Sequence, residues 1–141
     1  MLTNKIIGKL TADPEHKKNI LLLEEMLMVS LPADLREILI NYDDARFERK
    51  LFFRIVNSRF SQQMSVEKIL TPGQIISSQD ILKDDSLYME NKLVVFGETL
   101  GSPLICIAIE KENYGNVFVF DWDFGATKIA SSFKEFAEFL Q

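Results

Sequence analysis

Residues 93–140 read LVVFGETLGSPLICIAIEKENYGNVFVFDWDFGATKIASSFKEFAEFL, and the order of the apolar runs in this stretch decides the fold. Three runs rich in Val, Ile and Phe, at 93–96, 104–109 and 117–122, are separated by segments with glycine or charged residues, which is typical of β-strands. Residues 127–130 predict a short edge strand. Ser132 and Glu135 then form a capping-box pattern that begins a helix. Sequential strands with short connections predict an antiparallel sheet.

The run at 104–109 is nearly all apolar, which predicts a central strand covered on both faces. It contains Cys106, the only cysteine of the chain, so an internal disulfide is excluded. We expect this thiol to be buried and inert, because burial raises the pKa of a thiol.

Two helices precede the sheet. The first is predicted to begin at Asp13-Pro14-Glu15 and to run to about Val29, and the second to begin near Pro32. Apolar residues at 35, 38, 39 and 42 lie on one face of the second helix, and residues 41–44 are expected to end it as a turn. Further along, 51–56 and 65–70 predict strands, and 74–83 a short helix.

Together these elements predict an α+β fold with a central, mostly antiparallel sheet of about four to six strands. N-terminal helices and a C-terminal helix pack on that sheet. With 141 residues, of which 47% are hydrophobic and 26% charged, the chain is expected to form a single domain over residues 1–141, with residues 1–12 only partly ordered.

The net charge is −5, from 16 basic and 21 acidic side chains. This charge argues against direct binding of nucleic acid, which needs clustered Lys and Arg, and it permits binding to a basic partner. No apolar stretch approaches the roughly 20 residues needed to span a bilayer, and the N-terminus lacks the pattern of a signal peptide. We therefore expect no membrane partner and a cytoplasmic location.

No motif in the chain predicts catalysis. His16 is the only histidine, it stands in the first turn of the first helix, and we expect it to be exposed to solvent. One His and one Cys argue against a zinc site. The loop Gly97–Ser102 lacks the phosphate-binding pattern and is expected to be a structural turn. The chain is thus predicted to need no metal and no cofactor, and not to be an enzyme.

Six carboxylates are the candidate partner-binding residues. Two of them flank Trp122 at a strand end, where they would point to one face and could hold a cation or grip an Arg-rich partner, or simply face water. The other four form adjacent pairs in loops, and such pairs either are solvated turns or attract a basic partner. The six residues are Asp43, Asp44, Asp84, Asp85, Asp121 and Asp123.

Several segments together resemble the SUKH superfamily, which includes the bacterial relatives of a fungal cell-wall assembly regulator. The matching segments are LPADLREIL at 31–39, VVFG at 94–97, the apolar run at 104–109, GNVFVFD at 115–121 and IASSFKEF at 129–136. The chain differs in two places: 41–44 replaces the glycine-rich turn that usually follows the LP helix, and Gly101-Ser102 replaces the usual Gly-Asp.

The resemblance implies an α+β fold and, in bacteria, an immunity protein that binds a cognate toxin, often a nuclease, and blocks it without catalysis. The fungal relatives suggest an adaptor or regulatory scaffold as the alternative. An enzyme of unrecognised type is a third possibility, and it would require a deep pocket lined by converging polar groups.

Overall fold

The computed structural model describes residues 6–10, 14–47, 51–56, 61–82, 92–99, 101, 103–121 and 125–139, and the account below concerns these residues. Their elements follow the order β1 (Ile6–Leu10), α1 (Pro14–Leu27), α2 (Ala33–Asn41), β2 (Tyr42–Phe47), β3 (Leu51–Val56), β4 (Ser61–Ile69), α3 (Pro72–Leu82), β5 (Leu93–Thr99), β6 (Leu104–Ala108), β7 (Val117–Asp121), β8 (Gly125–Ala130) and α5 (Phe133–Phe139).

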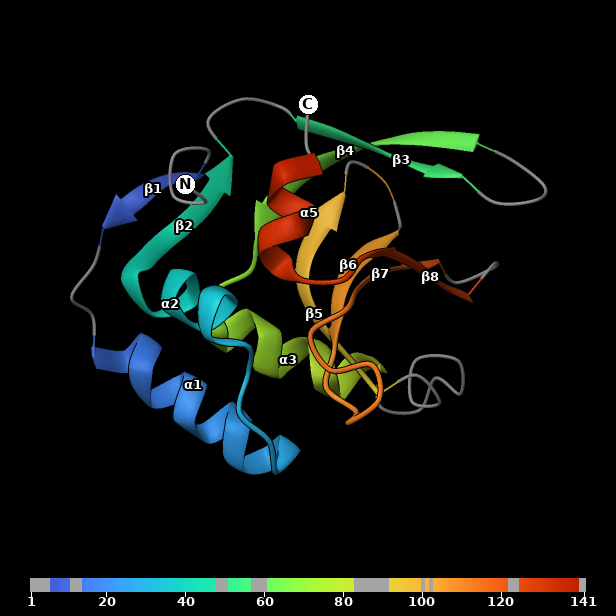
Figure 1. The fold of residues 1–141 in the computed structure, drawn as a ribbon. Coiled ribbons are helices and arrows are strands. Elements are labelled where there is room, and N and C mark those ends of the chain that lie inside the picture. Colours follow the sequence, from blue (N-terminus) through green and yellow to red (C-terminus); the bar gives the residue numbers. More distant parts are fainter. Residues whose placement is uncertain are drawn as a thin grey trace.

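Six of the described strands form one antiparallel sheet in the order β3-β4-β5-β6-β7-β8, which is also their order in the chain (Figure 1). The apolar strand β6 lies between β5 and β7, as the run at 104–109 predicted. Helices flank the sheet, so the predicted α+β class with an antiparallel sheet is confirmed.

Strand β2 was not foreseen, because residues 41–44 had been expected to form a turn. The chain instead leaves α2 at Asn41 and enters β2 at Tyr42, which pairs antiparallel with β1. Lys9 lies opposite Asp43 and Leu10 opposite Tyr42. The pairing partner lies more than 30 residues earlier in the chain, so tertiary contact overrides the turn preference of Asp43 and Asp44.

Strand β5 continues past Gly97, where the sequence had suggested its end, and reaches Thr99. The pairing with β6 shifts between Val95 and Gly97, which marks a β-bulge or a similar irregularity at the glycine. A Cβ atom at Gly97 would lie 3.2 Å from the Lys68 carbonyl oxygen and 3.4 Å from Ile105. The glycine therefore allows β4 and β6 to approach β5 closely on both sides.

Helix α5 contacts the sheet through an aromatic cluster. Phe96 of β5 meets Phe133 and Phe136 of α5 in edge-to-face geometry, with ring centroids 5.5 and 6.3 Å apart. All three rings are fully buried. Cys106 is also fully buried, and the loss of solvent raises the pKa of its thiol well above the usual range, as expected from the sequence.

Helix α1 turns one face to the interior, and that face includes His16. Ile20 and Leu23 are completely buried, and His16 keeps only 9% of its surface exposed. The prediction of an exposed histidine was therefore wrong. His16 stands four residues before Ile20 and so shares its face, whereas the neighbours Glu15 and Lys17 point to solvent.

Helix α3, which was expected from residue 74, begins at Pro72 and has a reciprocal cap. The Gln74 amide donates to Thr71 Oγ1, and the Thr71 amide donates to Gln74 Oε1. Pro72 opens the helix between them, where its missing N–H costs no intrahelical hydrogen bond.

Candidate partner-binding surface

The connection between α1 and α2 is fixed by Glu24. Its carboxylate accepts a hydrogen bond from the Leu31 amide at 2.8 Å and forms a salt bridge with the Arg36 guanidinium at 3.2 Å. Asp34, in the first turn of α2, accepts a hydrogen bond from the Lys134 amide in the first turn of α5 at 3.1 Å. The two carboxylates thus join three helices, and Asp34 supplies an acceptor for an amide in the first turn of α5, where intrahelical acceptors are missing.

The exit from α1 puts a methionine in an unfavourable position. The Val29 amide donates to the Glu24 carbonyl and the Met28 amide donates to the Glu25 carbonyl, which together are the hydrogen bonds of a Schellman motif. Met28 occupies the left-handed position of that motif, with φ of 59°, and its side chain is 92% exposed. Glycine is the usual residue there, so the methionine adds backbone strain and exposed apolar surface at one point.

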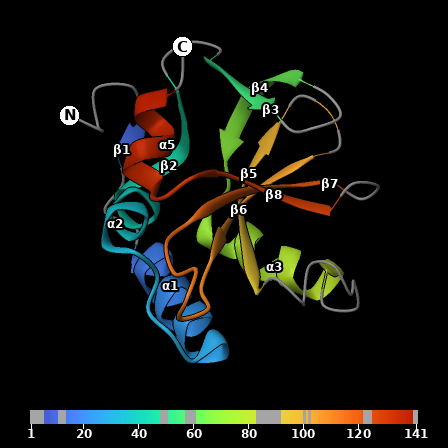
Figure 2. The same cartoon turned by 45° about the vertical axis from the view of Figure 1, so that its right-hand side comes forward.

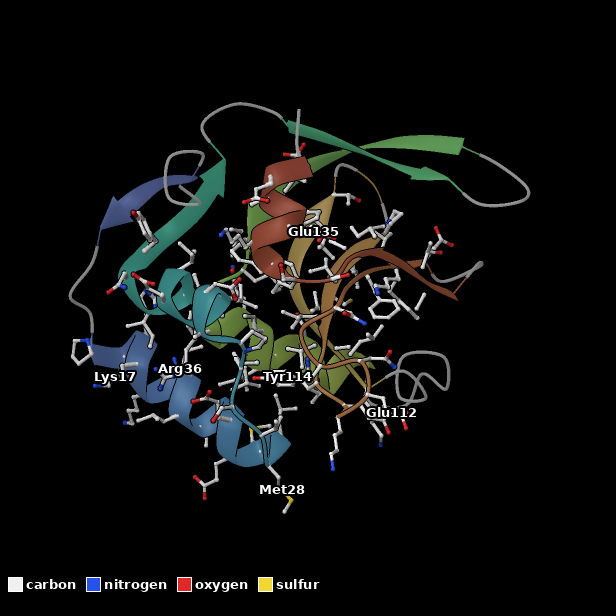
Figure 3. The ribbon with its side chains drawn as sticks, viewed as in Figure 1. Lys17, Met28, Arg36, Glu112, Tyr114 and Glu135 are labelled. Atoms are coloured by element: carbon white, nitrogen blue, oxygen red, sulfur yellow. The ribbon has the colours of Figure 1, made fainter. Side chains whose placement is uncertain are left out.

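The hairpin between β6 and β7 lies beside this exit. The Tyr114 hydroxyl donates a hydrogen bond to the Ser30 carbonyl oxygen, which joins the hairpin to the connection between α1 and α2 (Figure 3). Within the hairpin, the Gly115 amide donates to the Ala108 carbonyl, and Gly115 takes a φ of 86°. The Tyr114 ring remains 42% exposed.

We call the surface formed by Met28, Glu110, Glu112 and Tyr114 the hairpin surface. Met28 stands two residues from Ser30, which Tyr114 contacts, and both glutamates of the hairpin are exposed. Partial burial and the nearby carboxylates of Glu24 and Asp34 raise the pKa of Tyr114. The carboxylates of Glu24 and Asp34 thus disfavour the ionised phenol, and Lys111 is also exposed on the hairpin.

The candidate carboxylates from the sequence do not form one cluster with this surface. Asp121 ends β7 opposite Gly125 and is half-buried. Asp43 and Asp44 lie in β2, on the other side of the molecule from the β7–β8 end in both views (Figure 2). Asp84, Asp85 and Asp123 lie outside the described residues, and so do the side chains of Asp43 and Asp44.

Among the described residues, no three His, Cys, Asp or Glu side chains come together in a way that could hold a metal ion. In the same part of the chain, no helix is long and apolar enough to cross a bilayer.

Sequence reasoning missed Met28 and Tyr114 as surface residues. Tyr114 has a visible signal, because an aromatic residue inside the polar hairpin segment 110–116 has no apolar face to join. Met28 has no such signal, since it ends the largely apolar segment 20–28 and looks like its neighbours there.

Comparison with known families agrees with this architecture. The model of the SMI1 / KNR4 family (SUKH-1) matches residues 14–138, from the start of α1 to the last turn of α5. A comparison with curated proteins gives no match. The family match confirms the resemblance found in the sequence and extends it toward the N-terminus to include α1. Because the family match spans most of the chain, this protein belongs to the SMI1/KNR4 family (SUKH-1).

Proposed function

We propose that this protein is an immunity protein, which binds a cognate bacterial toxin in the cytoplasm and neutralises it by covering the surface that the toxin needs. The family match over residues 14–138 carries the proposal. The family relationship is consistent with such a role, and the chain's net charge of −5 suits a partner with a basic surface.

The hairpin surface has the features of a binding site for such a partner. Tyr114 and Met28 offer exposed apolar area, and Tyr residues are frequent among the side chains that dominate interface energies. Glu110 and Glu112 are exposed on the same hairpin as Tyr114 and add negative charge to it. A toxin that acts on nucleic acid has a basic groove, and a protein seated over that groove excludes the substrate without any chemistry.

The direct test is co-expression with the toxin encoded by the neighbouring gene. Wild-type protein should protect the cells and should bind the catalytically inactive toxin domain in isothermal titration calorimetry. The function is refuted if the chain neither binds nor protects. A partner that is bound but is not toxic would point instead to the regulatory scaffold.

The surface is tested separately by charge reversal. Glu112→Lys should weaken toxin binding about tenfold or more, because a repulsive contact replaces an attractive one. Glu138→Lys, on the exposed side of α5, makes the same charge change away from the hairpin and should leave binding unchanged. If wild-type protein binds and both variants bind equally well, the function stands and the hairpin surface is the wrong site. Asp121→Lys then tests the candidate from the sequence whose side chain the structure describes.

A further inference from the structure

Helix α1 exposes leucines on the side opposite its buried face. Leu21 and Leu22 are 52% and 47% exposed, whereas Ile20 and Leu23 are fully buried. The two leucines line a shallow open hollow of about 480 Å³ together with Pro14, Lys17, Lys18 and Glu25. We call these six residues the outer face of α1.

The outer face is accessible to another molecule. Helix α1 forms the lower edge of the molecule in both ribbon views and packs on α2 and α3 from below (Figures 1 and 2). Exposed leucines in a contiguous patch are typical of a contact surface, because a solvated helix face gains nothing from them.

The charges on the outer face are arranged so that the face is complementary to itself. Lys18 and Glu25 stand at equal distances along the helix on either side of the midpoint between Leu21 and Leu22. At 1.5 Å per residue, each lies about 5 Å from that midpoint. An antiparallel pair of α1 helices related by a two-fold axis through the midpoint therefore brings Lys18 of each copy opposite Glu25 of the other, with the leucines between them.

We propose that the outer face of α1 binds a second copy of this chain and forms a two-fold symmetric dimer. In a parallel pair Lys18 would face Lys18 and Glu25 would face Glu25, so charge complementarity selects the antiparallel arrangement. A two-fold contact of this kind is closed and stops at two subunits.

The size of the face limits the strength of the dimer. Helix α1 has 14 residues and is about 21 Å long, so one helix pair buries less area than a standard stable interface. We therefore expect a reversible dimer with a dissociation constant above about 1 μM. The dimer leaves Tyr114 and the hairpin glutamates outside its centre, so this inference does not depend on the proposed toxin.

Analytical ultracentrifugation of the full chain over about 1–500 μM, at low ionic strength, tests the dimer. Wild-type protein should shift from monomer to dimer as its concentration rises. Lys18→Glu and Glu25→Lys should each weaken self-association about tenfold or more, because both reciprocal pairs become repulsive. Leu22→Glu should abolish it. Circular dichroism checks that each variant remains folded.

Charge exchange gives the decisive comparison. The double variant with Lys18→Glu and Glu25→Lys should dimerise again, and an equimolar mixture of the two single variants should form a heterodimer. Lys128→Glu on β8 and Glu138→Lys on α5 are matched controls that should dimerise like wild-type protein, since both residues are exposed and lie on other elements.

Three results would overturn the proposal. The first is a wild-type chain that stays monomeric at every concentration. The second is a dimer that the single reversals do not weaken or the exchange does not rescue. The third is a monomeric chain whose toxin binding is lost in Leu22→Glu, which would assign the outer face to the toxin.

Discussion

Met28 combines backbone strain with exposed apolar surface, and a protein that binds no partner there has no reason to retain either. Its backbone is left-handed and its side chain is almost fully exposed. The left-handed conformation costs an L-residue roughly 1–2 kcal/mol, and such strain persists mostly where a residue has a further role. The proposed role is apolar contact with a partner at the hairpin surface.

We predict that Met28→Gly stabilises the folded protein by about 0.5–1 kcal/mol, because glycine adopts the left-handed conformation freely and this gain exceeds its entropic cost. Urea denaturation measures the change in the free energy of unfolding. Met28→Ala keeps a Cβ atom at the same backbone angle, so it serves as the control and should be near wild type. Equal stabilities of the two variants would show that φ at Met28 carries no strain.

Tyr114 should make stability depend on pH in the alkaline range. Burial and the carboxylates of Glu24 and Asp34 raise its pKa above the ordinary value of 10.0, so the folded state holds the phenol proton more tightly than the unfolded state. The resulting stabilisation is complete below pH 10 and is lost as the pH rises through the pKa of the folded state.

Tyr114→Phe removes both this proton and the hydrogen bond to Ser30, and should cost about 0.5 kcal/mol near neutral pH because the site is partly exposed. The difference in unfolding free energy between wild type and variant should stay constant from about pH 7 to 9 and shrink above pH 10. Urea denaturation at a series of pH values measures it. A difference that grows above pH 10 would contradict the pKa direction.

The sequence predicted acidic candidate residues but did not predict that Met28 and Tyr114 would be exposed on the hairpin surface. Asp121 could be placed at a strand end because an apolar run stops there, and the structure has it at the end of β7. Met28 and Tyr114 could not be assigned to one surface, because they are 86 positions apart and the hydrogen bond between Tyr114 and Ser30 that joins their segments has no signal in the sequence.

Elements with local signals were predicted well. The capping box at Ser132 is present, since the Glu135 amide donates to Ser132 Oγ, although the Glu135 carboxylate accepts from the Ser131 amide rather than from that of Ser132. Strands β1 and β2 were not predicted, because each depends on pairing with the other and Asp43 and Asp44 give β2 no strand pattern of its own. The local sequence was therefore enough to predict those elements whose stabilising contacts are close in the chain.

We predict that Ser132→Ala destabilises the protein by about 1 kcal/mol, because the Glu135 amide in the first turn of α5 loses its acceptor. Ser131→Ala is the matched control, since the Ser131 backbone amide that donates to Glu135 survives the change. Thermal unfolding of both variants measures the effect. Equal melting temperatures for the two would mean that the cap contributes nothing.

Gly97→Ala should destabilise the sheet by about 1–3 kcal/mol, because the new methyl group would press on the Lys68 carbonyl at 3.2 Å. That carbonyl belongs to the paired strand β4 and has little freedom to withdraw. Gly73→Ala is a control at the start of α3, where the nearest atom lies at 3.7 Å. Chemical denaturation should rank Gly97→Ala well below both the control and wild type.

At the scale of the whole molecule, the net charge of −5 predicts how a basic partner would arrive. Attraction between unlike net charges speeds the encounter, and salt screens it within about 10 Å at 0.1 M ionic strength. The association rate constant for the cognate toxin should therefore fall about tenfold between low and high salt, with little change in dissociation. Stopped-flow fluorescence measures both rates. An association rate that is independent of salt would exclude electrostatic steering.

The order of the strands in the sheet has a further consequence for how the protein folds during synthesis. Because β3 to β8 pair in the order of synthesis, four of the five pairings close a short loop, which costs little entropy, and the pairing of β4 with β5 spans α3. Folds dominated by such nearby contacts fold faster than those that must join distant segments. The sheet can therefore grow strand by strand as the chain emerges, and α5, which follows β8 in the chain, docks on Phe96 after the six strands.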